Sequence, residues 1–389
     1  MKDKIIKQIK DSIESKFGIL SSMGVCNGLA GVSLFYYYYA AYKKDPDYLE
    51  MSIRFLEESI DGLNDNYRGT TILRDIIEIG TLLDFYAKEN IIDKSDIDFF
   101  YENFDDTLVS FFRESLSAAD LSPISGAINF GYYFADRLKE KDFSAELADL
   151  IDRIEELSWT GPKGIYWYSS IERNGHHLIE LGGSHGVAGV ASFLLHLYEL
   201  GLQKERLTRL ITGALDYILL YRHEDSSLYT FPFDASEKEV NDRINLAYGD
   251  LSIGYAFYKA GKLLGIDSYK LTGIEILTKS GNVRDEGGAF VKDAILLYGS
   301  EGISSFFSLF KQELSTDQFD KAIKYWKKKT LTLNNHENEF AGYRSYFNQF
   351  DVNTPLSLMN GIIGIGISLM SEDLTKNNFE FLKYLRYTL

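Results

Sequence analysis

The chain has 389 residues, 45% of them hydrophobic, and a formal net charge of −16. That length and apolar content support a large core, whereas the acidic balance argues against nucleic-acid binding, because phosphates require a basic protein surface. A single cysteine, Cys26, excludes an internal disulfide and any zinc site built on several thiolates. With 5 prolines and no linker rich in Ser, Gly or Pro, the sequence predicts one domain over residues 1–389.

The two ends of the chain give no sign of a membrane protein. The N-terminal stretch MKDKIIKQIKDSIESKFG predicts a charged amphipathic helix and lacks the apolar core of a signal peptide. Near the C-terminus, the apolar run LMNGIIGIGISLM is shorter than the ~20 residues that cross a bilayer. We therefore expect a soluble, cytoplasmic protein without a transmembrane segment.

A small-x-x-small pattern recurs along the chain. In chain order it reads GLAG at 28–31, GAIN at 126–129, GVAG at 186–189, GDLS at 249–252, GSEG at 299–302 and GIIG at 361–364. The segment IEIG at 77–80, which keeps only the later glycine, fills the one gap. Successive starts lie about 50 to 60 residues apart, which predicts seven repeated units.

Each unit predicts a pair of helices. An apolar helical stretch follows each small pair, and amphipathic helices lie between them; in residues 204–222, apolar side chains recur every three or four positions. Alternation of the strand type is scarce. We predict an all-α protein, a seven-fold α/α toroid with an inner ring of seven helices inside an outer ring. The glycines are expected to let tapering inner helices approach each other closely.

The residue before each small pair is expected at the N-terminal end of an inner helix. Unpaired N–H groups and helix dipoles would converge there and favour an anion. Most of these residues can form hydrogen bonds, and among them we expect Asn27, Tyr248, Tyr298 and Asn360 to line a substrate cavity. The full set is Asn27, Ile76, Ser125, His185, Tyr248, Tyr298 and Asn360.

Three segments carry a family resemblance. LGGSHGVAG at 181–189, RINLAYGDLSIG at 243–254 and VKDAILLYGSEG at 291–302 resemble the motifs LGLAHGxxG, RxxWCYGxxG and DxSLCHGxxG of the lanthionine synthetase cyclase (LanC-like) family. The likeness extends over nearly the whole chain. It implies an α/α toroid that adds a cysteine thiolate to a dehydrated Ser or Thr of a ribosomal precursor peptide, which closes a thioether (lanthionine) ring.

The resemblance also assigns roles to residues. His185 matches the family's histidine, an acid or base, and Arg243 matches its arginine, which would stabilise an enolate oxygen. The family's catalytic aspartate falls on Ser122, and Asp120 is the nearest carboxylate that could replace it.

The family's three zinc ligands, two cysteines and a histidine, correspond here to Ala247, Leu297 and Tyr298. Zinc takes nitrogen, sulfur or carboxylate ligands, so the comparison implies a cyclase without a metal. Some cyclase domains of this family that are fused to kinase and lyase domains also lack these ligands.

Two other functions stay open. A non-catalytic LanC-like protein could bind the precursor peptide, or serve as a scaffold for a lanthipeptide dehydratase. An α/α-toroid glycoside-processing enzyme would need two carboxylates across its cavity, and the positions before the small pairs hold neither Asp nor Glu.

Single residues also have structural interpretations. His185 could cap a helix, and Arg243 could pair with Asp242 or Glu239. Cys26 is expected to be a small buried residue. The pair His176 and His177 is expected in a loop at the entrance of the cavity.

Overall fold

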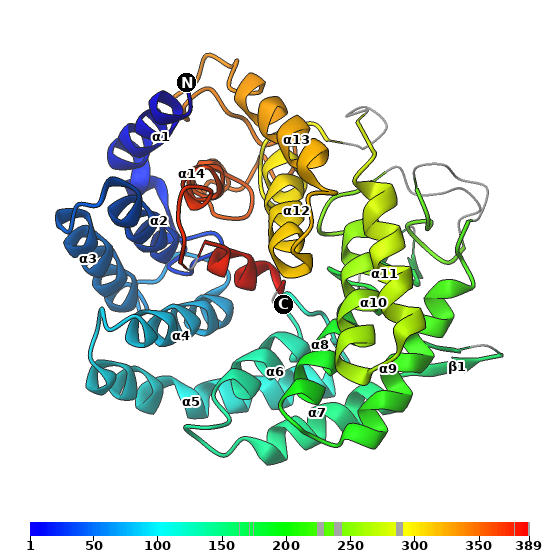
Figure 1. Ribbon diagram of the computed structural model, residues 1–389. Helices are drawn as coiled ribbons and strands as arrows, with labels where there is room; N and C mark the ends of the chain where they lie inside the picture. Colours follow the sequence, from blue (N-terminus) through cyan, green and yellow to red (C-terminus); the bar gives the residue numbers. More distant parts are fainter. Residues whose placement is uncertain are drawn as a thin grey trace. The chain divides into compact units, whose positions relative to one another are not determined.

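Figure 1 shows the computed structural model of the chain. It describes residues 1–162, 164–170, 172–173, 175–223, 229–236, 243–284, 291–376 and 378–387. Two compact units divide the chain: one comprises Met1–Phe104 and Val291–Leu389, and the other comprises Asp105–Phe290. The single domain expected over residues 1–389 stays a prediction.

All regular secondary structure in the described residues of the first unit is helical, and loops connect the helices. Its elements are α1 (Lys2–Lys16), η1 (Phe17–Ile19), α2 (Leu29–Lys43), α3 (Asp47–Asp61), α4 (Ile72–Lys88), the first part of α5 (Lys94–Ser117), α12 (Ser300–Leu314), α13 (Asp320–Thr332), α14 (Ile362–Ser371) and η2 (Glu380–Leu385).

The second unit adds two short hairpins to its helices. It holds the rest of α5, then α6 (Ala127–Asp136), α7 (Ser144–Glu156), β1 (Trp159–Gly161), β2 (Gly164–Tyr166), β3 (Glu172–Arg173), β4 (His176–His177), α8 (Val187–Glu199), α9 (Lys204–Leu219), α10 (Asp250–Leu264) and α11 (Asp267–Ser280). The strands form two antiparallel pairs, β1 with β2 and β3 with β4.

Buried and amphipathic helices alternate along the chain. In the first unit α2 packs on α3 and α12 on α13, and in the second α6 packs on α7, α8 on α9 and α10 on α11. The even-numbered helix of each pair buries most of its residues, whereas its partner buries fewer, mainly on one face. The last buried helix, α14, packs against the N-terminal helix α1. The predicted all-α class with helix pairs is confirmed in the described residues.

The paired glycines contact the loop that precedes their own helix. Gly186 and Gly249 are the N-cap residues of α8 and α10 and have extended backbone conformations. A Cβ atom at either position would overlap the carbonyl oxygen six residues earlier, that of Glu180 or Arg243. The prediction that these glycines serve helix-to-helix approach is therefore wrong, because the close contact is between the helix start and its own loop.

The same loops occupy the N–H groups at the helix starts. In α8, the N–H groups of Val187, Ala188 and Gly189 donate to carbonyl oxygens of Glu180, Leu181 and Gly182, with N···O distances of 2.9, 3.2 and 3.3 Å. Because these donors already have partners, the expected ring of unpaired N–H groups is not present here. Only the helix dipole still favours negative charge at this end.

The second repeat departs from the pattern. The helix α4 begins at Ile72, so Ile76 lies a full turn inside it and not at its N-terminal end as expected. Because position 77 is isoleucine and not a glycine N-cap, the helix starts earlier, at Ile72. Two carboxylates of α4 accept hydrogen bonds from the loop that precedes α2 instead. Asp75 accepts the N–H of Met23 and Glu78 accepts the N–H of Cys26, each with an N···O distance of 2.7 Å.

Candidate functional site

His185 and Asp120 line one cavity of the second unit, with a volume of about 410 Å³. His185 immediately precedes the N-cap glycine of α8. Asp120 lies in the loop between α5 and α6, six residues before the N-cap glycine of α6. The structure therefore brings together two of the three predicted catalytic residues, and both are half-buried.

The third predicted catalytic residue joins His185 through Tyr248. The His185 and Tyr248 rings stack with 6.3 Å between centroids. The guanidinium of Arg243 lies 5.9 Å from the centre of the Tyr248 ring and 5.2 Å from that of Phe233. Phe233 and Tyr248 meet edge to face at 5.4 Å. Tyr248 thus contacts both the imidazole and the guanidinium, as well as the phenylalanine.

Phe233 is the one member of this cluster that the sequence analysis missed. Backbone hydrogen bonds place it, since the N–H of Leu181 donates to the Phe233 carbonyl at 3.2 Å and that of Ala235 donates to Ile179 at 3.0 Å. No motif marks the position. A pairing of Arg243 with Asp242 or Glu239 lies outside the described residues.

Ser122, where the family's aspartate falls, holds its loop together. Its hydroxyl accepts the N–H groups of Ile124 and Ser125 at 3.2 and 3.3 Å. Asn245, at the same repeat position before α10, accepts the N–H groups of Ala247 and Tyr248 at 3.1 and 2.9 Å. The position therefore has a structural role in both repeats. The carboxylate of Asp120 accepts the Ser122 N–H at 2.9 Å.

The other predicted binding residues belong to the first unit. Asn27 and Tyr298 are half-buried, and the Tyr298 ring lies 4.6 Å from that of Phe347. Asn360 is buried and lines a separate cavity of about 300 Å³, together with Arg344 and Tyr343. All three precede the N-cap glycine of a buried helix, as the repeat pattern predicts.

The residues at the family's metal-ligand positions do not fit a zinc ion. Ala247 and Leu297 have no side-chain donor atom, and their backbones link neighbouring repeats: Ser184 donates to the Ala247 carbonyl at 3.0 Å, and Leu297 donates to that of Met359 at 3.1 Å. The Tyr298 side chain packs on an aromatic ring. Within the described ranges, no group of three His, Cys, Asp or Glu side chains could hold a metal.

Two further expectations concern histidine and cysteine. His176 and His177 form strand β4, paired with β3, and not the expected loop. Both are exposed, and His177 lines the cavity of His185, where its Nε2 atom lies 3.2 Å from a carboxylate oxygen of Glu172. Cys26 is buried as expected. Burial raises the pKa of its thiol well above the usual range, so it is a poor nucleophile.

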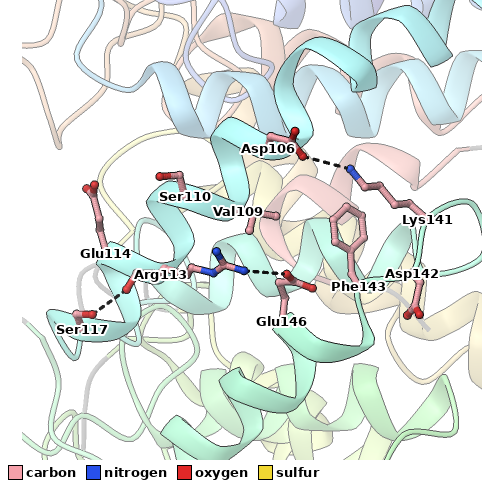
Figure 2. A pocket seen from close by; sticks show the side chains of 10 residues that line it. All are labelled: Asp106, Val109, Ser110, Arg113, Glu114, Ser117, Lys141, Asp142, Phe143 and Glu146. Atoms are coloured by element: carbon pink, nitrogen blue, oxygen red, sulfur yellow. Dashed lines mark hydrogen bonds and ion pairs between the residues drawn. The ribbon is translucent and has the colours of Figure 1, made fainter.

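A second hollow of the second unit, a groove of about 830 Å³ between α5 and α7, has a different character (Figure 2). Two ion pairs cross it, Arg113 with Glu146 and Lys141 with Asp106, both at 3.7 Å. None of its lining residues is His or Cys. Of these two hollows, the cavity of His185 is the one lined by histidine.

In the described residues the chain is built mainly of paired helices, and the candidate residues His185 and Asp120 lie in loops that lead into buried helices. The family model for the lanthionine synthetase C-like protein matches residues 21–385, and the chain belongs to this family. Among solved structures, it is similar to nisin cyclase, with a TM-score of 0.75 and 16% sequence identity over 99% of this chain and 96% of that one. This similarity confirms the predicted fold class, the α/α toroid.

A search of curated proteins finds no match to the sequence. In the described part of the chain, no helix has the length and apolar character needed to cross a membrane.

Proposed function

We propose that the protein is a lanthipeptide cyclase that acts without zinc. It would add a cysteine thiol of a precursor peptide across the double bond of a dehydrated Ser or Thr. The observation that carries this proposal is the cavity shared by His185 and Asp120, with Arg243 joined to His185 through Tyr248. Membership of the family and the similarity to nisin cyclase support the same class of reaction.

The chemistry follows from these side chains. His185 takes the proton of the thiol, and the sulfur then forms a bond to the β-carbon of the dehydroamino acid. The electron pair of the double bond moves to the carbonyl oxygen, where the guanidinium of Arg243 stabilises the enolate by a charge-assisted hydrogen bond. His185 returns its proton to the α-carbon, while the Asp120 carboxylate offsets the positive charge of the imidazolium. No atom is gained or lost in the sum.

This scheme needs no metal, because thiolates add to dehydroamino acids even without a catalyst. Cysteine has a pKa of about 8.5, so a base near neutral pH supplies enough thiolate. Since Ala247 and Leu297 offer no donor atom, the thiolate would be stabilised by the helix dipole and by nearby positive charge. The dehydrated residue must come from a dehydratase acting earlier, which we propose as a partner.

The test uses a synthetic peptide that carries one cysteine and one dehydroalanine. Loss of free thiol is followed with time, and the non-enzymatic rate is subtracted because thiolates add to dehydroalanine unaided. His185→Ala should lower kcat by about 10²–10⁴-fold. Arg243→Lys should also lower it, because an ammonium cannot replace a forked donor. Peptide affinity should change little in either variant.

A non-catalytic scaffold is the second candidate. The observation that favours it is the loss of every family metal ligand together with the structural use of Ser122. A scaffold would bind the precursor peptide or a dehydratase without exceeding the background rate. If the wild-type protein binds the peptide but adds no thiol above background, this second function replaces the first.

A further inference from the structure

Strands β1 and β2, which pair with each other and carry aromatic residues, stand beside the acid–base cavity of the second unit. Trp167, which follows β2, is buried, and its indole N–H donates to the Ile154 carbonyl of α7 at 2.7 Å. Tyr166 of β2 stacks on Tyr217 of α9 with 4.6 Å between ring centroids. These contacts fix the hairpin to two helices.

Close packing reinforces this anchoring. A Cβ atom at Gly164 would lie 2.6 Å from the backbone of Gly213 and of Tyr217, so β2 rests directly on α9. The side chain of Ile165 fills the space above Gly213. The hairpin therefore has the support that a preorganised binding surface requires.

Two large aromatic side chains of this hairpin region are open to solvent. Trp159 is 56% exposed and Tyr168 is 45% exposed, and their rings meet edge to face at 5.8 Å. Both line the 410 Å³ cavity that also holds His185 and Asp120. One cavity therefore has an aromatic part and an acid–base part.

We propose that Trp159 and Tyr168 form a subsite for an apolar side chain of the precursor peptide, in the residue next to the one that reacts. This inference rests on the proposed function. Trp and Tyr provide large, rigid contact areas at low entropic cost. Neighbouring Cα atoms of a peptide are about 3.8 Å apart, so a residue held at His185 directs its neighbour into the rest of the same cavity.

The size and character of the cavity fit this occupant. Its volume lies within the ~300–1,000 Å³ of small-ligand pockets, which suits one large side chain and adjoining backbone. Leu121, Leu157 and Val190 add to the apolar lining of the cavity. The aromatic subsite would thus select which dehydrated residues reach His185.

The test is a binding assay that needs no catalysis. Fluorescein-labelled nonapeptides of the frame Lys-Gly-Gly-Ser-X-Ala-Gly-Gly-Lys, with X as Phe, Leu, Ala or Asp, are titrated with the protein, and anisotropy gives Kd. The wild type should bind the Phe and Leu peptides about tenfold more tightly than the Ala and Asp peptides. Trp159→Ala and Tyr168→Ala should each remove most of that preference.

Phe111→Ala is the matched control, because Phe111 is also an exposed aromatic residue of this unit and does not line the cavity. It should leave all four Kd values unchanged. The inference is overturned if the wild type shows no preference for X, if no peptide binds, or if both cavity variants weaken all peptides equally.

The outcome is separable from that of the proposed function. These peptides contain serine and cannot react, so a preference for X that depends on Trp159 supports the subsite even if the protein adds no thiol. Conversely, thiol addition without a preference for X supports the cyclase and rejects the subsite.

Discussion

The imidazole of His185 stacks on the Tyr248 ring at 6.3 Å and 30°, and the Arg243 guanidinium lies 5.9 Å from the same ring. One tyrosine therefore contacts both groups that the proposed reaction needs. The sequence predicted that Tyr248 lines a substrate cavity, but Tyr248 is not among the residues that line the cavity of His185. In the proposed reaction its task is instead to fix the relative placement of a base and a cation.

We predict that Tyr248 acts through its ring and not through its hydroxyl. Tyr248→Phe keeps the stacked ring and should lower kcat for thiol addition by less than about threefold. Tyr248→Ala should lower kcat by ten- to a hundredfold, because small misplacements of reacting groups cost about 10² in rate. Steady-state kinetics with the dehydroalanine peptide separates kcat from KM. Equal damage in both variants would show that the hydroxyl takes part in the chemistry.

We also predict that the purified protein holds no stoichiometric zinc. The positions of the family's ligands carry side chains of Ala247 and Leu297, which have no donor atom, and of Tyr298, which packs on Phe347. Elemental analysis of protein prepared without chelators should give far less than one zinc per chain. One tightly bound zinc per chain would contradict the prediction, and dialysis against a chelator should leave thiol addition unchanged.

The repeat pattern in the sequence predicted the helix pairs and the place of His185 before a helix start. The prediction succeeded because a glycine N-cap is a local feature: the loop that folds back on the helix needs a residue without Cβ at Gly186. Local rules failed where side chains from distant segments meet. Phe233 joins the site through backbone bonds to residues 179–181, and no spacing in the sequence indicates that contact.

Ile76 shows a second limit of sequence reasoning. The repeat pattern indicated a helix in this segment but not the residue at which it begins. The helix α4 begins at Ile72, four residues before Ile76. The side chains of Asp75 and Glu78 accept the N–H groups of the loop before α2. Such a replacement of backbone acceptors by carboxylates becomes evident only in three dimensions.

Gly249→Ala should destabilise the protein and disturb the site together. The new Cβ would overlap the Arg243 carbonyl, so the loop must move, at a cost of roughly 2 kcal/mol or more. Because that loop carries Arg243, kcat should fall as well. Gly161→Ala is the control in the same unit, since the nearest atoms to its Cβ would be 3.8 Å away. Chemical denaturation measures both, and equal stability of the two variants would contradict the close-approach argument.

Glu301 makes stability depend on pH. It lies in α12, is completely buried, and one of its carboxylate oxygens accepts the Ser368 hydroxyl. Burial raises its pKa from 4.5 to about 7, the negative charge of Glu372 adds to that rise, and Ser368, Thr330 and Lys327 oppose it. Between these two pH values the folded state holds a proton that the unfolded chain has lost. The free energy of unfolding therefore falls as pH rises from about 4.5 to 7, and no further loss from this group follows above pH 7.

Glu301→Gln removes that titration while keeping the shape of the side chain, so its effect on stability should change sign or size with pH. The difference in free energy of unfolding, variant minus wild type, should be up to about 3 kcal/mol larger at pH 8 than at pH 5, since one pKa unit corresponds to ~1.4 kcal/mol. Urea denaturation at both pH values measures the difference, in which the contributions of other buried carboxylates cancel. Glu57→Gln removes an equal charge from the exposed face of α3 and controls for the overall negative charge. If the gain from Glu301→Gln is the same at pH 5 and pH 8, the folded protein does not hold a proton on Glu301.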